Sequence, residues 1–179
     1  MVAFDRPQIK KVAVIGPECS GKSDLSQFLA DHYKTAFVPE YARAYLDRLI
    51  QPYVQSDLTK IANGQLRLEY ENERDSNRVM ICDTNLYVIK IWSEFKFGEV
   101  DKEILHHIET EKYDLYLLTY IDIPWQDDPQ REHPDKREEL YQLYLNEMKN
   151  QSTPFVEIKG ERDQRRKIAV DAIDKMLLA

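Results

Sequence analysis

The residues with the clearest chemical signature form the segment Gly16–Ser23, which reads GPECSGKS. It fits the pattern G-x-x-x-x-G-K-[ST], in which backbone N–H groups of a glycine-containing loop surround phosphate oxygens. In such a loop the lysine, here Lys22, reaches the β- and γ-phosphates, and the Ser23 hydroxyl is a ligand of Mg²⁺. The segment therefore predicts a site for ATP and Mg²⁺. The predicted ATP contacts within and beside it are Gly16, Glu18, Cys19, Ser20, Gly21, Lys22, Ser23 and Asp24.

The residues on both sides of this segment supply the elements that a phosphate-binding loop requires. The run Lys11–Ile15 is apolar and β-branched, which is typical of a buried strand. After the loop, Leu25, Leu29 and Tyr33 recur with the spacing of one face of a helix. Strand, loop and helix in this order favour a nucleotide site over a chance match in a turn.

Further apolar runs predict four more strands, at Ala36–Val38, Val79–Asp83, Leu115–Thr119 and Phe155–Ile158. Helical spacing of apolar residues lies at 58–66, 140–148 and 168–177. Strands that alternate with helices predict an α/β fold, with a parallel sheet covered on both faces. Ligands of such sheets bind beyond the carboxyl ends of the strands, so the residues after each strand are the candidates for chemistry.

Acidic residues follow the second and third predicted strands. Glu40 could accept a proton from an attacking hydroxyl or bind sugar hydroxyls, and Arg43 could bind a substrate oxygen. Pairing between Glu40 and Arg43 is the alternative for both. Asp83 ends an apolar strand, as the acid of a Walker B segment does, and would hold Mg²⁺ opposite Ser23. A helix N-cap or a catalytic base are the alternatives for Asp83.

The segment between the fourth strand and the next helix, 122–136, combines three prolines with many charges. Prolines suppress regular structure, and long loops in compact domains are commonly lids; a solvated surface excursion is the alternative. Trp125 beside the carboxylates of Asp127 and Asp128 suits a flat cationic aromatic ligand, although the indole could instead anchor the loop.

Two arginines lie at the end of this segment. Arg131 and Arg137 could stabilise the charge on a transferring phosphoryl group, as an arginine finger does. Their alternative is surface pairing with neighbouring glutamates, which contributes little. After the fifth strand, Gly160 would let the backbone approach an adenine ring on which Arg162 or Arg165 could stack. An ordinary strand-to-helix turn is the alternative there.

Composition sets the broad class. The chain of 179 residues is 42% hydrophobic, so we expect a single globular domain over 1–179 with its lid at about 122–137. The net charge of −7 does not favour nucleic-acid binding, and no apolar run is long enough to cross a membrane. Because Met1–Lys10 lacks the apolar core of a secretory signal, a cytoplasmic protein is expected. Cys19 and Cys82 are expected to be reduced, small side chains, with a catalytic thiol as the alternative.

Several of these segments together resemble the nicotinamide riboside kinases that form the C-terminal domain of NadR-type NAD-biosynthesis proteins. The shared segments are Gly16–Ser23, Glu40-Tyr41-x-Arg43, Cys82-Asp83-Thr84, and Trp125-x-Asp127-Asp128 with Arg131 and Arg137. Their order and approximate spacing hold over nearly the whole chain. The resemblance implies a P-loop kinase fold with a five-stranded parallel sheet and a mobile lid. It also implies transfer of the ATP γ-phosphoryl to the 5′-hydroxyl of nicotinamide riboside, giving nicotinamide mononucleotide.

The predicted roles follow from both the residues and the resemblance. The predicted catalytic residues are Lys22, Glu40, Asp83, Arg131 and Arg137, and Gly160 and Arg162 complete the ATP contacts. The predicted acceptor contacts are Glu40, Tyr41, Arg43, Tyr87, Trp125, Asp127 and Asp128. An acidic protein with an indole and carboxylates near its lid is electrostatically suited to a pyridinium ring.

The chain departs from the family in two respects. With 179 residues it has no room for the nucleotidyltransferase domain, so adenylylation is not expected. Pro129-Gln130 stands where a Gly-Leu pair is more usual, which affects lid geometry and substrate choice. A kinase for another nucleoside or small alcohol is therefore the first alternative. An ATP-binding regulatory module that acts through a partner protein is the second, and a DNA-associated ATPase is disfavoured by the charge.

Overall fold

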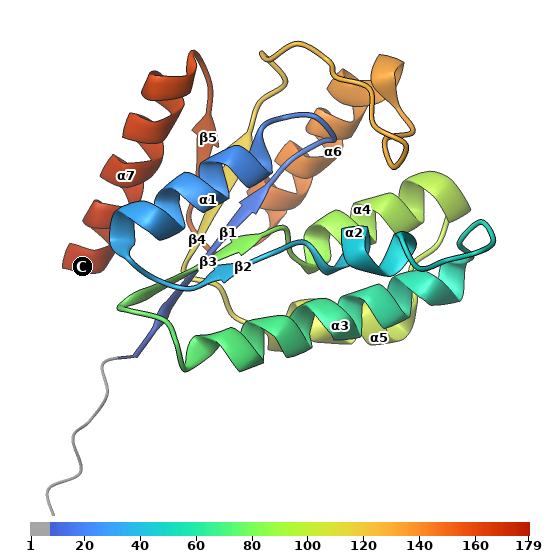
Figure 1. Ribbon diagram of the computed structural model, residues 1–179, viewed down its shortest axis with the longest axis horizontal. Coiled ribbons are helices and arrows are strands. Elements are labelled where there is room, and N and C mark those ends of the chain that lie inside the picture. Colours follow the sequence, from blue (N-terminus) through green and yellow to red (C-terminus); the bar gives the residue numbers. More distant parts are fainter. Residues whose placement is uncertain (1–7) are drawn as a thin grey trace, which may run out of the picture.

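A computed structural model describes residues 8–179 and contains one five-stranded sheet (Figure 1). All its strand pairs are parallel, in the spatial order β2-β3-β1-β4-β5. The strands are β1 Lys10–Ile15, β2 Phe37–Val38, β3 Val79–Asp83, β4 Leu115–Thr119 and β5 Phe155–Ile158. The last three have the predicted bounds, and the first two differ by one residue at their starts. The five-stranded parallel sheet of a P-loop fold is confirmed.

The helices form layers on both faces of this sheet (Figure 1). One face is covered by α1 (Lys22–Tyr33) and α7 (Arg162–Leu178), which pack on Val12 and Val14 of β1. The other is covered by α4 (Leu86–Phe97) and α6 (Arg137–Asn150), which share a core with Ala13 and Ile15. Because side chains alternate along a strand, a run of apolar residues serves both layers. The remaining helices are α2 (Tyr41–Leu46), α3 (Gln55–Glu73), α5 (Lys102–Thr110) and the 3₁₀ helix η1 (Pro134–Lys136).

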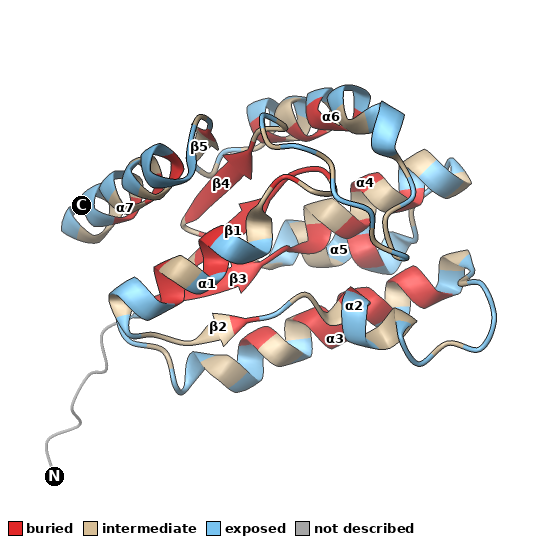
Figure 2. Cartoon of the chain, turned by 45° about the horizontal axis from the view of Figure 1, so that its top comes forward, coloured by how far each residue is buried: buried red, intermediate tan, exposed pale blue. Residues whose placement is uncertain are grey.

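A third apolar cluster joins α2, α3, α4 and α5 at the edge of the sheet. The predicted helical patterns at 58–66, 140–148 and 168–177 fall inside α3, α6 and α7. Helix α4 was not predicted because apolar residues lie around most of its circumference, since it packs against α3, α5 and α6 at once and its Ile91 joins the core cluster of the sheet. The three central strands β3, β1 and β4 are buried along most of their length, whereas the outer faces of the helices are exposed (Figure 2).

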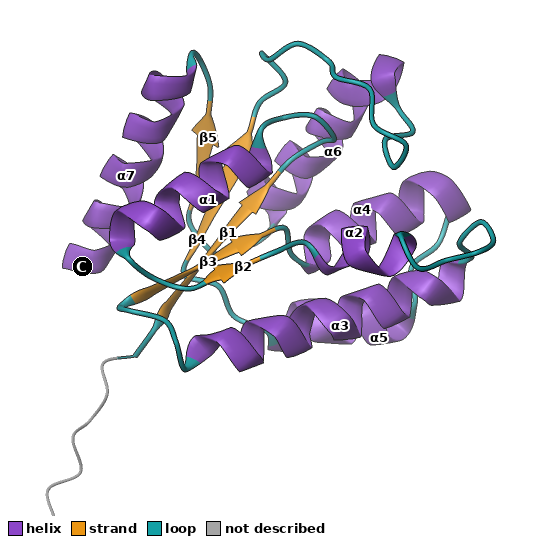
Figure 3. Ribbon diagram, in the orientation of Figure 1, coloured by secondary structure: helices purple, strands orange, loops and turns teal. Residues whose placement is uncertain are grey.

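The longest irregular stretch runs from Tyr120 to His133, between β4 and η1 (Figure 3). It includes most of the predicted lid and passes over the loop that follows β1. Cys19 and Cys82 are free, and Cys82 is fully buried in β3, as expected for a small core side chain. The expectation for the N-terminal segment falls largely on residues 1–7, which lie outside the described part of the chain. Among residues 8–179, no helix combines the length and apolar character needed to cross a membrane.

Candidate active site

A cleft of about 1310 Å³ opens at the carboxyl edge of the sheet. Its floor is the loop 16–21 with the first turn of α1, and its walls come from α2, α4, α6 and the start of α7. Residues 122–124 and 129–133 of the long loop close its top. The cleft therefore lies where a parallel sheet places ligands, and the long loop occupies the position of a lid. We call residues 120–133 the lid from here on.

Gly16 and Ser20 give the P-loop its shape. Gly16 has φ 143°, and a Cβ atom there would lie 2.4 Å from Oγ1 of Thr119, so only glycine fits. The buried Ser20 hydroxyl donates to the Pro17 carbonyl at 2.7 Å and lies 2.7 Å from the Thr119 hydroxyl. Thr119 in turn donates to the carbonyl of Ile15 at 3.0 Å. The loop is thus fastened to the ends of β1 and β4.

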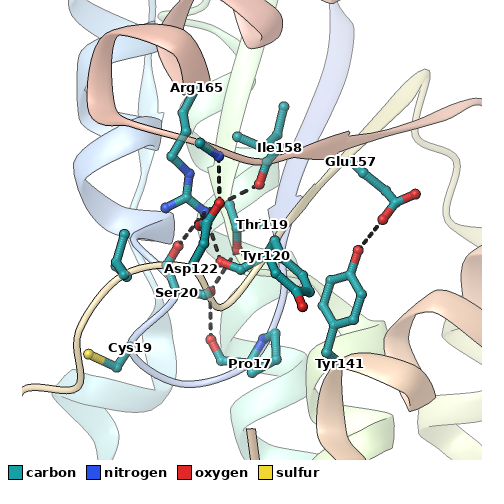
Figure 4. Close-up of polar contacts among 12 residues, drawn as sticks. Pro17, Cys19, Ser20, Thr119, Tyr120, Asp122, Tyr141, Glu157, Ile158 and Arg165 are labelled. Atoms are coloured by element: carbon teal, nitrogen blue, oxygen red, sulfur yellow. Dashed lines mark hydrogen bonds and ion pairs between the residues drawn. The ribbon is translucent and has the colours of Figure 1, made fainter. Parts of the chain in front are cut away.

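Arg165 of α7 supports this loop from behind (Figure 4). Its side chain is buried, and its Nη2 donates to the carbonyl oxygens of Ser20 at 3.0 Å, Tyr120 at 2.9 Å and Ile158 at 3.3 Å. Burial lowers the pKa of this guanidinium, but three carbonyls and the carboxylate of Asp122 at 3.6 Å compensate its charge. The guanidinium is therefore committed to the backbone, and the alternative in which Arg165 stacks on an adenine ring is wrong.

The P-loop is followed by Lys22, whose ammonium group lies in the lining of the cleft. The Lys22 ammonium donates to the carbonyls of Gly16 at 3.0 Å and Pro17 at 2.8 Å, and it lines the cleft. Glu18 also lines the cleft, and its carboxylate accepts the backbone N–H groups of Glu132 at 3.0 Å and His133 at 3.1 Å. One loop therefore presents an ammonium to the cleft and holds the lid by hydrogen bonds.

Asp83 supplies the strongest sign of a cation site. It is 3% exposed at the end of β3, and its Oδ1 atom is buried without a hydrogen-bond partner. Burial raises the pKa of Asp83, whereas the Ser23 hydroxyl and the positive charges of Lys22 and Arg43 lower it. A buried carboxylate oxygen without a donor is costly unless a ligand completes it. The donor set fits Mg²⁺, which prefers carboxylate and hydroxyl oxygens and keeps several ligands from phosphate and water.

The number of protein ligands agrees with that mode of binding. Within residues 8–179, no group of three or more His, Cys, Asp or Glu side chains is placed to hold a metal ion by itself. An ion held by Ser23 and Asp83 would therefore take its remaining ligands from the nucleotide and water, as Mg²⁺ does in phosphoryl-transfer sites.

Thr84, directly after Asp83, has a strained backbone. Its φ of 85° is rare for a β-branched residue, and its buried hydroxyl lacks a hydrogen-bond partner. Such strain concentrates at functional sites. The N-cap of α4 is Asn85, whose side chain accepts the N–H of Tyr87 at 3.0 Å. The N-cap alternative for Asp83 is therefore wrong.

Glu40 stands on the opposite wall, at the N-terminus of α2. It lines the cleft, and within residues 8–179 its carboxylate makes no hydrogen bond or ion pair. Crowding by the surrounding protein raises the pKa of Glu40, with Lys22 and Arg43 opposing and the nearby Asp83 reinforcing the shift. The predicted alternative, pairing with Arg43, does not form, because Arg43 pairs with Asp128 of the lid at 2.9 Å. Glu40 is thus a carboxylate with a raised pKa that is free to accept a proton.

The lid residues divide into those that reach the cleft and those that do not. Arg131 lines the cleft, donates to the Gln126 carbonyl and lies 3.5 Å from the Cys19 sulfur. Arg137 lies outside the cleft lining and donates to the carbonyls of Cys19 at 2.8 Å and Ile123 at 3.1 Å, so it ties the lid to the P-loop.

Trp125 does not face the cleft. Its ring centroid lies 5.9 Å from the guanidinium carbon of Arg131 and 5.9 Å from that of Arg137, and its indole N–H donates to Asp127 at 2.8 Å. The structure does not bring Trp125, Asp127 and Asp128, three of the predicted acceptor contacts, to the lining of the cleft. These side chains bind arginines and one another, so the anchoring alternative for the indole holds.

Tyr41 and Tyr87 also lie elsewhere than predicted. The Tyr41 ring packs on α3 so closely that a Cβ at Gly64 would lie 2.1 Å from it. Tyr87 meets Tyr116 edge-on in the core under α4, with ring centroids 5.8 Å apart. Neither residue lines the cleft, because both rings complete apolar clusters instead.

The end of the cleft next to α7 combines charges with a glycine turn. Gly160 has φ 95°, and its N–H donates to Asp122. Asp24 and Arg162, both predicted ATP contacts, line the cleft and pair with each other, with Nε 3.1 Å from Oδ2. The hydrogen bond from Arg162 lowers the pKa of Asp24. This pair borders the space beside the P-loop where a nucleotide base would lie.

Sequence reasoning missed the wall opposite the P-loop. This wall is aromatic and apolar, and its residues are Leu46, Leu49, Pro52, Tyr53, Val88, Ile91, Trp92, Phe95, Leu140 and Tyr144. None of them follows a strand, which is where the sequence directs attention. The available signal was the spacing of Val88, Trp92 and Phe95 along α4, and the same spacing is typical of a core-facing helix.

Comparisons with known proteins agree with this arrangement. The family model described as AAA domain matches residues 11–165. The "Trifunctional NAD biosynthesis/regulator protein NadR" of Escherichia coli (strain K12) is 26% identical over 178 residues, covering 94% of this chain and 43% of that protein. NadR of Salmonella typhimurium shows the same values. The chain therefore spans less than half the length of these curated relatives.

Solved structures share the fold. A crystal structure of NadR protein in complex with NR has a TM-score of 0.77 and 21% identity, over 96% of this chain and 52% of that one. Thymidylate kinase from Candida albicans has a TM-score of 0.66 and 16% identity, over 94% and 92% of the two chains. Deoxyadenosine kinase from M. mycoides with bound dCTP has a TM-score of 0.57 and 13% identity, over 92% and 99%.

Proposed function

The chain belongs to the AAA domain family, and from that premise we propose that it is an ATP- and Mg²⁺-dependent kinase that phosphorylates nicotinamide riboside. The product would be nicotinamide mononucleotide, an intermediate of NAD salvage. Support comes from the similarity to NadR over 94% of the chain and from the shared fold with a NadR protein in complex with NR. The cytoplasm, where ATP is abundant, is the compartment that this reaction favours.

The residues around the P-loop take the following parts in this proposal. Lys22 and the loop amides hold the ATP phosphates, while Ser23 and Asp83 hold Mg²⁺. When bound, the ion neutralises charge on the phosphate oxygens. Arg131 lies at the cleft and stabilises charge on the transferred group, whereas Arg137 fixes the lid to the loop.

Glu40 is the residue that we propose as the general base. The 5′-hydroxyl oxygen of the acceptor bonds to the γ-phosphorus, the bond from that phosphorus to the β–γ bridging oxygen breaks, and ADP leaves. Glu40 accepts the hydroxyl proton. The observation that carries the proposal is that two carboxylates near Lys22 lack a full set of partners among residues 8–179. Glu40 lines the cleft together with Lys22, and the buried Asp83 has an oxygen without a hydrogen-bond partner. A nucleotide-binding switch transfers no phosphoryl group to an alcohol, so it would not need Glu40 as a base.

A kinase for another nucleoside is the second candidate, because thymidylate kinase and deoxyadenosine kinase share the fold. Purified protein should therefore be incubated with Mg-ATP and a panel of nicotinamide riboside, adenosine, deoxyadenosine, cytidine and thymidine, with nucleoside 5′-phosphates measured by mass spectrometry. A Lys22→Ala variant serves as the inactive control. We expect nicotinamide riboside to be consumed fastest. The assignment is wrong if it stays untouched while another nucleoside is phosphorylated.

A further inference from the structure

The far end of the cleft holds a cation inside a cage of aromatic and acidic side chains. The Lys96 ammonium lies 4.0 Å from the ring centroid of Tyr53 and donates to both carboxylate oxygens of Glu132, at 2.8 and 3.0 Å. Trp92 lies edge-on to Tyr53, with centroids 4.9 Å apart, and its indole N–H donates to the Tyr53 hydroxyl at 2.8 Å. We call Tyr53, Trp92 and Glu132 the cage; all three line the cleft.

The cage has the chemistry of a site for a positively charged group. An aromatic face attracts a cation within about 6 Å of its centroid, and a carboxylate adds direct attraction. The Tyr53 hydroxyl also donates to Glu132 at 2.9 Å, which fixes the carboxylate beside the ring. Burial opposes the charged form of Glu132, but the hydrogen bonds from Lys96 and Tyr53 outweigh it and lower the pKa of the carboxyl group. Glu132 is therefore an anion held ready for a cationic partner.

The occupant of the cage is not a buried structural group. The side chains of Lys96 and Glu132 are 32% and 35% exposed, so the pair opens to the cleft and an exposed lysine can turn out into solvent. An ion pair of this exposure contributes little to stability. A cationic ligand that reaches the same place can therefore replace the ammonium at small cost.

The cage is linked to the P-loop through a single residue. The side chain of Glu132 belongs to the cage, and its backbone N–H donates to the Glu18 carboxylate at 3.0 Å. Its neighbour His133 also donates to Glu18, and the His133 ring packs edge-on against Phe95 of the cleft wall. The lid residue that supplies the carboxylate of the cage is therefore also hydrogen-bonded to the P-loop.

We propose that the cage is the subsite for the positively charged ring of the acceptor, and that Lys96 is an internal competitor which that ring displaces. This inference rests on the proposed function and gives it a specificity determinant. A pyridinium ring can replace the ammonium because it returns positive charge to Glu132 and a cation to the Tyr53 face. A neutral ring of the same shape returns neither, so the Lys96–Glu132 pair excludes it. The cage with its Lys96–Glu132 pair therefore selects acceptor rings by their charge rather than by their shape.

Two acceptors that differ in ring charge test this proposal. Nicotinamide riboside carries a pyridinium cation, and its reduced dihydropyridine form is neutral. For Lys96→Met we expect the KM for the cationic riboside to fall about tenfold, because Glu132 is left without its internal partner. For Glu132→Gln we expect that KM to rise about tenfold. The KM for the neutral riboside should fall in both variants, because the ammonium that excludes the neutral ring is then absent or is no longer held by a carboxylate.

Matched controls keep the outcomes separate. Lys167→Met breaks a comparable exposed ion pair with Asp171 on α7, outside the cleft, and should change neither KM. Melting temperatures of all variants establish that they fold. If Glu132→Gln changes the KM of both ribosides in the same direction and by the same factor, the cage does not read charge and the inference is wrong while the proposed function stands. If the unaltered protein phosphorylates neither riboside but accepts another nucleoside, the proposed function fails instead.

Discussion

Two buried carboxylates, Asp83 and Glu69, show how one fold treats the same chemical problem in opposite ways. Asp83 is 3% exposed and Glu69 is 0% exposed, and burial raises the pKa of both. Glu69 of α3 is compensated by the fold, because Lys11 lies 3.2 Å away and the Tyr113 hydroxyl donates to it at 2.8 Å. Oε2 of Glu69 lacks a hydrogen-bond donor but faces the Lys11 ammonium, whereas among residues 8–179 Oδ1 of Asp83 has neither a hydrogen-bond donor nor an ion-pair partner.

The difference follows from position along the sheet. Lys11 lies near the amino end of β1, where its ammonium reaches Glu69. At that end of the sheet the two charges compensate each other as an ion pair. Asp83 ends β3 at the carboxyl edge, where the strands deliver their side chains to the cleft. A raised pKa alone therefore does not mark a functional carboxylate. The lack of a protein partner is what marks a functional carboxylate. A buried charge that the protein leaves uncompensated persists only where a ligand compensates it.

Asp83→Asn should have the largest effect of these substitutions: a strong loss of activity without the loss of stability expected for Glu69→Gln. Loss of the metal-binding charge is expected to lower kcat/KM by at least about 100-fold. The free energy of unfolding should stay the same or rise by about 1 kcal/mol, because a buried charge without a partner is removed. Kinase assays with a Mg²⁺ titration, and urea unfolding of the same sample, measure both. A stability loss comparable to that of a core substitution would show that Asp83 is a structural residue like Glu69.

Glu40→Gln should also impair catalysis while leaving the fold intact. A positioned general base contributes about 100-fold or more, so kcat should fall by about that factor with the KM for the acceptor unchanged. Glu139→Gln on the exposed face of α6 is the matched control, because Glu139 lies outside the cleft and, among residues 8–179, forms an ion pair only with Lys136. A raised KM with unaltered kcat would mean that Glu40 binds the ribose hydroxyls instead of taking the proton.

Glu69→Gln should show the reverse pattern. We expect a loss of about 2 kcal/mol in the free energy of unfolding, because the partly buried Lys11 loses its closer partner and keeps only Glu111 at 3.6 Å, and no change in kinase activity. Replacing both members, with Lys11→Met and Glu69→Gln together, should recover most of that loss. If the double variant is as unstable as the single one, the pair is not the source of the effect.

The smallest expected effect is a difference between the unaltered protein and Asp83→Asn in how the free energy of unfolding depends on pH. A carboxyl group whose folded-state pKa is raised binds more protons when folded than when unfolded, so its contribution is fully present below the unfolded pKa. That contribution is lost as the pH rises through the folded-state pKa. Asp83→Asn should therefore gain stability relative to the unaltered protein as the pH rises through that range. The gain in the free energy of unfolding should be about 1.4 kcal/mol for each unit by which the pKa of Asp83 is higher in the folded than in the unfolded state. A difference that stays constant with pH would contradict a raised pKa for Asp83.

The strands and the phosphate-binding end of the site were predictable because the signals are local. Each strand is a continuous apolar run, and Gly16, Lys22, Ser23 and Asp83 lie at fixed places relative to such runs. The environment of Trp125 was not predictable, because it depends on two arginines that the folded lid brings to the indole. The cage escaped prediction for the same reason, since a loop, a helix and the lid contribute one residue each.

The most direct test of the account is the effect of Mg²⁺ on nucleotide binding by Asp83→Asn. Thermal and urea unfolding would be measured with AMP-PNP, in excess Mg²⁺ or in EDTA, for the unaltered protein and the variant. A ligand at 100 times its Kd stabilises the folded state by about 2.7 kcal/mol. We expect the unaltered protein to gain that stabilisation only with Mg²⁺, and Asp83→Asn to respond equally to AMP-PNP with and without the ion. An undiminished Mg²⁺ effect in the variant would contradict the central claim that Asp83 is completed by the metal–nucleotide complex.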